Sequence, residues 1–119
     1  MSTLKLDTIA SRDGTESTDV TNVINGSAKA WVNFNGTGTV AIRKSFNVSS
    51  ITDGGVGIYT VNFTNALEDV DYSVCGTSSN GYGLSNYSNV TAPTTTSVKV
   101  ITYAGGFADL PYNSVAIFR

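Results

Sequence analysis

Three carboxylates stand close together within residues 66–71, and they are the first side chains to consider as metal ligands. Glu68, Asp69 and Asp71 could supply hard oxygen donors to a cation such as calcium. Their spacing does not match the Asp-x-Asp-x-Asp-Gly pattern of EF-hand loops. The segment is therefore predicted to be a solvated turn, and we expect neither a metal ion nor another cofactor.

Residues that could serve as a nucleophile and its base are sparse. The chain has no histidine, so neither a Cys-His nor a Ser-His pair can form. It contains no Gly-x-Ser-x-Gly motif and no phosphate-binding loop. Asp53, beside a glycine turn, lacks the apolar setting that a glycosidase acid needs. We therefore expect no catalytic residue and no enzymatic activity.

Cys75 is the one cysteine, so no disulfide can form within the chain. It lies in the alternating segment Tyr72-Ser73-Val74-Cys75, which favours a small side chain that is buried or half-buried. A reactive thiol and a disulfide between chains are the alternatives.

Two long loops have the composition of adaptable binding surfaces. Residues 79–95 are rich in Tyr, Ser, Gly and Asn, and residues 104–113 combine Gly with Phe and Tyr. Tyrosine offers rigid contact area, whereas serine and asparagine offer hydrogen bonds. Turns in β-proteins are rich in the same residues, so both interpretations stay open. The candidate partner-binding residues are Tyr82, Tyr87, Phe107 and Tyr112.

Composition limits the class of protein. A chain of 119 residues is enough for one domain with a core. Its net charge is −2 and its seven basic residues are scattered, whereas nucleic-acid binding needs a basic face. No apolar run approaches the roughly 20 residues of a membrane helix, and residues 1–15 lack the apolar core of a signal peptide. We expect a chain made in a cytoplasm that neither binds nucleic acid nor inserts into a membrane.

The elements that must position these side chains are β-strands, because apolar and polar residues alternate over short segments. The predicted strands cover residues 29–34, 39–48, 57–64, 72–78, 96–103 and 114–118. Within residues 39–48, Val40 and Ile42 should face inward, followed by Phe46 and Val48 after a change of register near Arg43-Lys44. Short strands at this spacing predict an all-β fold, either an antiparallel β-sandwich of jelly-roll-like type or a small barrel. The predicted core consists of Phe34, Val40, Ile42, Val61, Phe63, Val74, Val100 and Ile117.

Trp31 lies on the opposite face of its strand from Ala30, Val32 and Phe34. Because those three apolar residues should face the core, Trp31 should face outward, where a large side chain needs cover. Either it packs against the N-terminal segment or the linker, or it is a candidate subunit-interface residue.

Residues 1–28 are predicted to form an arm, separate from a sandwich domain of residues 29–119. Residues 2–10 alternate as a strand does and should pair with the body or with another subunit. The candidate attachment residues are Leu4, Leu6 and Ile9. Residues 11–28 are polar and carry turn signals, which predicts an extended linker, with a short helix as the alternative.

The words KAWVNFNGTGTVAIR at residues 29–43 and YTVNF at residues 59–63 resemble a segment of tail-fibre and other virion-surface proteins of tailed bacteriophages. The resemblance covers residues 29–76 and, more weakly, residues 2–9. The turn departs from it: that family usually has Asp-Asn-Gly-Thr-Gly-Asp-Tyr, where residues 53–59 read DGGVGIY. The resemblance implies a structural or host-contacting module, generally trimeric, with no catalytic residues.

Two functions follow from this resemblance. The first is a bacteriophage virion structural protein, a short fibre or knob that contacts a glycan or protein of the host surface. The second is a capsid decoration (cement) protein that stabilises the shell. In both, the chain is located in the virion, its partners are other virion proteins of the capsid or tail, and it forms a homotrimer.

Overall fold

The computed structural model describes residues 1–79, 84–85 and 92–119, with residues 84–85 described by their backbone alone. Its body is built from β3 (Ala28–Asn35), β4 (Ala41–Phe46), β5 (Val48–Asp53), β6 (Ile58–Phe63), β7 (Ser73–Ser78), β8 (Leu84–Ser85), β9 (Ser97–Thr102) and β10 (Asn113–Phe118). Before the body come β1 (Thr8–Ala10), β2 (Ser17–Asp19) and one short helix, α1 (Val20–Gly26).

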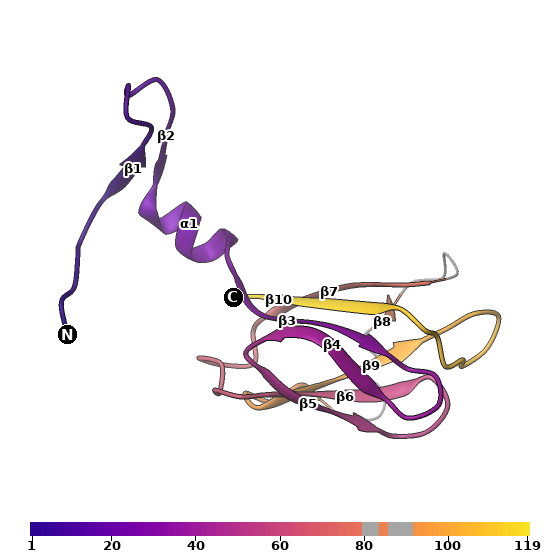
Figure 1. Cartoon of the computed structure of the whole chain (residues 1–119). Helices are drawn as coiled ribbons and strands as arrows, with labels where there is room; N and C mark the ends of the chain where they lie inside the picture. The colour runs from indigo at the N-terminus through magenta and orange to yellow at the C-terminus, as the bar shows by residue number, and fades with distance from the viewer. Residues whose placement is uncertain (80–83, 86–91) are drawn as a thin grey trace.

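The body is an antiparallel β-sandwich (Figure 1). One sheet has the strand order β4-β3-β10-β7, and the other has the order β5-β6-β9-β8. Neither sheet closes on itself among the described residues, so of the two predicted architectures the structure has the sandwich and not the barrel. The all-β prediction is confirmed.

The core lies between the two sheets, where the strands bury alternate residues. Phe34 and Tyr59 are completely buried and meet edge to face, with ring centroids 5.1 Å apart. The predicted core is confirmed: Phe34, Val61, Phe63, Val100 and Ile117 are buried, and Val40, Ile42 and Val74 are half-buried against them.

The chain changes sheets at Asn47. Residues 29–63 hold four strands instead of the three predicted, because the stretch from 41 to 53 is two strands in different sheets. Asn47 has φ of 54°, a left-handed conformation that asparagine tolerates better than most residues. Its side chain donates to the carbonyl oxygens of Lys29 and Asn65 and accepts from the Asn65 amide at 2.8 Å. These bonds fix the corner between β4 and β5.

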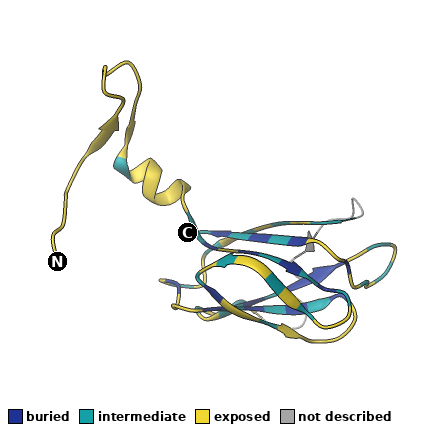
Figure 2. Ribbon diagram, viewed as in Figure 1, coloured by how far each residue is buried: buried dark blue, intermediate teal, exposed yellow. Residues whose placement is uncertain are grey.

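The residues before β3, here called the arm (residues 1–27), leave the body instead of packing on it. Every residue of the arm is exposed except Val20, which is half-buried (Figure 2). The radius of gyration, 16.8 Å, is larger than the roughly 13.5 Å expected of a compact chain of this length. The difference arises because the arm extends the longest dimension to 51 Å.

Two predictions for the arm are corrected. Residues 2–10 do not form one strand, since only Thr8–Ala10 is paired as a strand, and its partner is Ser17–Asp19 within the arm itself. The predicted extended linker of residues 11–28 contains the helix α1, so the alternative of a short helix is confirmed. Sequence reasoning missed this hairpin because the Asp13-Gly14 turn signal was assigned to a linker and not to two flanking strands.

Candidate binding surfaces

The arm presents apolar side chains to solvent. Leu4 is 81% exposed, Leu6 48% and Ile9 44%. On α1, Val23 and Ile24 are exposed as well, and no residue of the helix is buried. A seven-residue helix without packing is marginal in water. The arm is therefore suited to acquiring its cover from a partner.

The hairpin of the arm is held by its turn. The Asp13 carboxylate accepts hydrogen bonds from the Ser11 hydroxyl at 2.7 Å, the Thr15 amide at 3.0 Å and the Thr15 hydroxyl at 2.7 Å. These bonds, that of Ser11 first, lower the pKa of Asp13 from 3.8 to about 2. The arm thus has a local polar framework that leaves its apolar side chains free for contact.

Trp31 lies on the outer face of the sheet β4-β3-β10-β7. It is 37% exposed, so its cover within the chain is incomplete. Its cross-strand neighbour on β4 is Phe46, which is 53% exposed. Phe46 was expected to alternate inward with Val48. A register shift in the pairing of β3 with β4 turns it outward instead, and that shift lies near Arg43-Lys44 as the sequence suggested.

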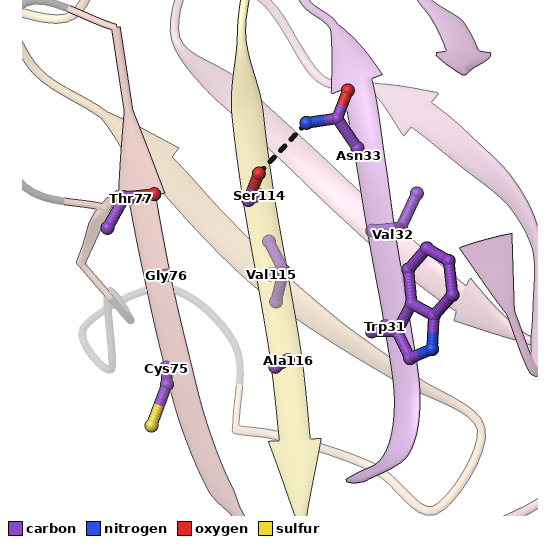
Figure 3. Close-up of a pocket in the computed structure, with 9 residues that line it drawn as sticks. All are labelled: Trp31, Val32, Asn33, Cys75, Gly76, Thr77, Ser114, Val115 and Ala116. Carbon is purple, nitrogen blue, oxygen red and sulfur yellow. Dashed lines mark hydrogen bonds between the residues drawn. The ribbon is translucent and has the colours of Figure 1, made fainter. Parts of the chain in front are cut away.

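A shallow groove of about 520 Å³ runs along this face beside Trp31 (Figure 3). Its polar rim includes the Asn33 amide, which donates to the Ser114 hydroxyl at 2.9 Å. Cys75 lines the groove and is exposed, which corrects the prediction of a buried or half-buried thiol. The reason is strand phase: Val74 packs toward the core, so Cys75 points to the outer face.

The far end of the body carries the aromatic loop between β9 and β10. β3 and β9 run toward this end and β10 starts there, so the loop lies opposite the end from which the arm leaves (Figure 1). Phe107 is 48% exposed and meets Tyr103 edge to face, with centroids 6.5 Å apart. Tyr112 is 58% exposed, and the Arg43 guanidinium lies 4.2 Å from its ring centre. Tyr82 and Tyr87 lie outside the described residues.

A buried tyrosine fastens this loop to the sandwich. The Tyr59 hydroxyl donates to Asp109 Oδ1 at 2.7 Å, and the Gly57 amide donates to the same oxygen at 2.8 Å. Burial, reinforced by the charge of Asp109, raises the pKa of Tyr59, so its hydroxyl remains a donor. Asn113, also buried, donates to the Leu110 carbonyl at 2.9 Å. These bonds hold the loop in place on the sandwich as a platform. No sequence pattern indicated this role for Asp109.

The carboxylates of residues 66–71 have a cation of the chain itself, the Arg119 guanidinium, as their main partner. Arg119 donates two bonds to Asp69, at 2.8 Å and 2.6 Å, and this lowers the pKa of Asp69 from 3.8 to about 2. Glu68 lies 4.0 Å from the same guanidinium. Within residues 1–79 and 92–119 no group of three or more potential metal ligands occurs. The pair instead ties the last residue of the chain to the turn before β7.

Comparison with known proteins finds no relative of this chain. No family model, no curated protein and no solved structure matches the chain. No helix in the described part of the chain is long and apolar enough to cross a membrane. The surfaces must therefore be interpreted from their own geometry.

Proposed function

We propose that this protein is a bacteriophage virion structural protein, a short fibre or knob that is anchored by its arm. The observation that carries the proposal is the separation of two kinds of exposed surface. Leu4, Leu6 and Ile9 are exposed at one end, and Phe107 and Tyr112 at the other. A connector needs this arrangement, because its two partners must be held apart.

The chemistry of the two ends supports different partners. An extended apolar segment can add to a sheet edge or a groove of another virion protein through main-chain bonds and a few side-chain anchors. A platform of Tyr, Phe and Arg offers rigid rings and a cation, which suit a glycan or a protein of the host surface. In this proposal the chain is a homotrimer, which would gather three platforms at one end and raise binding by multivalency.

The experiment separates the two ends in assembled particles. Deleting residues 1–10 should abolish incorporation into virions while the purified body keeps its β-sheet circular dichroism. Changing Phe107 and Tyr112 to Ala should leave incorporation intact and weaken adsorption to cells. The matched control is Val56→Ala, an exposed apolar residue in the β5–β6 turn at the same end of the body.

The decoration protein is the other candidate, and the same experiment distinguishes it. A shell-stabilising protein needs its arm but not its far platform. Normal adsorption by the Phe107 and Tyr112 variant, together with capsids that break at lower temperature when the protein is omitted, would replace the fibre proposal with this one. Incorporation without residues 1–10 would contradict both.

A further inference from the structure

One row of residues crosses the outer face of the sheet β4-β3-β10-β7 from edge to edge. Phe46 pairs with Trp31, Trp31 with Ala116, and Ala116 with Cys75. Directly paired residues share a face, so all four side chains stand on the outer side. The row is asymmetric: two exposed aromatic side chains occupy one half, and two small side chains border the groove in the other half (Figure 3).

Such a row is complementary to itself under one kind of symmetry. A rotation axis parallel to the strands brings the β4 edge of one copy to the β7 edge of the next. We propose that this face is the contact between copies of the chain, with Phe46 of one copy opposite Cys75 of the next and Trp31 opposite Ala116. An axis across the strands would place Trp31 on Trp31 and leave both grooves empty.

The neighbouring row supports the same pairing. Lys44 pairs with Asn33, Asn33 with Ser114, and Ser114 with Thr77. Under the proposed rotation Lys44 meets Thr77 and Asn33 meets Ser114, so polar groups meet polar groups and the lysines stay apart. Although the chain has nine acidic residues, neither row contains one. A face that has an apolar row, a polar row with one cation and no carboxylate fits a second copy of the chain better than it fits a saccharide, whose hydroxyls need more polar partners.

The size of the face indicates how much more contact is needed. Four strands about 4.8 Å apart and about 20 Å long present roughly 400 Å² of flat area, whereas each partner in a stable complex buries about 800 Å². The exposed apolar side chains of the arm are the nearest source of the remainder, because the arm continues directly from β3, the strand that holds Trp31. The face alone should therefore give a weak oligomer, and the arm should strengthen it.

This inference rests on the proposed homo-oligomer but not on the proposed virion role. An axis parallel to the strands has a consequence for orientation: every arm leaves at one end of the assembly, and every aromatic loop lies at the other. A cyclic dimer and a cyclic trimer are both compatible with the proposed contacts of this row, since each places the β4 edge against the β7 edge of a neighbour.

The direct test is a disulfide between copies. Within one chain, positions 46 and 75 are three strand spacings apart, about 14 Å, so no internal bond can form. In Phe46→Cys, mild oxidation should link each copy to the next through the native Cys75. Non-reducing gels should then show a covalent dimer or trimer as the main species, and its size reports the symmetry. The matched control is Thr52→Cys, an exposed position on the edge strand of the other sheet.

Phe46→Cys removes one ring of the contact, so a second variant tests the contact without it. Ala116→Arg should fill the groove and shift the sedimentation of the purified chain to the monomer, whereas Thr60→Arg, on the central strand β6 of the other sheet, should not. An oligomer that persists in Ala116→Arg, with no linked product from Phe46→Cys, would overturn this contact but keep the homo-oligomer. A monomeric wild-type chain would overturn both.

The fluorescence of Trp31, the only tryptophan, distinguishes a second copy of the chain from a saccharide as the occupant of the groove. If copies associate through this face, the emission maximum should move to shorter wavelength as protein concentration rises. A shift on adding soluble dextran to a chain that stays monomeric would mark the groove as a saccharide site and overturn the proposal.

Discussion

The arm and the body of this chain are stabilised in opposite ways. In the body, Phe34, Tyr59 and Val61 are completely buried, and side-chain hydrogen bonds fasten the loops to that core. In the arm, the defining contacts are local hydrogen bonds around Asp13, and the apolar side chains face solvent. The comparison teaches that the exposed apolar residues of the arm do not support the fold of the body. They are available to partners because the body does not need them.

The largest expected effect tests whether the body depends on its core. Phe34→Ala should lower the free energy of unfolding by about 3–5 kcal/mol, because it removes a fully buried ring and its contact with Tyr59. Phe46→Ala, on the neighbouring strand but 53% exposed, should lower it by only about 0.5 kcal/mol. Urea unfolding of both variants measures the contrast. Equal losses would mean that Phe34 and Phe46 do not lie on a buried and an exposed face of the sheet.

A second, smaller effect tests the far end of the body. Gly57 has φ of 68°, and a Cβ there would lie 2.6 Å from the Thr102 carbonyl oxygen and 2.7 Å from the Ala108 nitrogen. Gly57→Ala should therefore lower the free energy of unfolding by about 2–3 kcal/mol, through backbone strain and the clash together.

Gly105→Ala is the control for strain alone. Its φ is 78°, but no atom lies within 4 Å of the added Cβ, so the loss should be about 1 kcal/mol. Thermal or urea unfolding gives both values. If the two glycines tolerate alanine equally, the aromatic loop is not held against the β5–β6 turn as tightly as its hydrogen bonds indicate.

The third prediction compares two carboxylates, one in each region, whose pKa values are both lowered from 3.8 to about 2. A lowered folded-state pKa gives stability that is present above about pH 4 and lost as the pH falls toward about 2. Asp69 is bonded to Arg119 in the body, so Asp69→Asn should reduce body stability at about pH 6 and make little difference at about pH 2.

Asp13 should behave differently in the same measurement. Its bonds lie wholly within the arm hairpin, so Asp13→Asn should leave the urea midpoint of the body unchanged at both pH values. A matching pH-dependent loss in both variants would show that arm and body unfold as one unit, and it would remove the contrast between them.

The amount that sequence could predict differs between the regions for a physical reason. Burial imposes strict alternation on β6, so Tyr59, Val61 and Phe63 were readable as one face. Alternation is broken at the corner at Asn47, which is why the two strands joined there were taken as one. It is also broken by the register shift between β3 and β4, which is why Phe46 was assigned to the wrong face. The arm buries nothing, so no pattern fixed its hairpin, and the pairing of Arg119 with Asp69 joins residues 50 positions apart.

The smallest expected effect is the most direct test of the comparison. Removing residues 1–26 takes away the hairpin and α1 while leaving β3 complete. The deleted side chains bury almost nothing, because only Val20 among them is even half-buried. The body should therefore keep its free energy of unfolding within about 0.5 kcal/mol, measured by urea titration at a protein concentration low enough to keep the chain monomeric. At higher concentration the shortened chain should associate less than the full chain, because the arm then supplies contact area to a neighbour. A loss of several kcal/mol in the monomer would mean that the arm packs on the body in solution, and its apolar side chains would then be part of the fold and not a surface for partners.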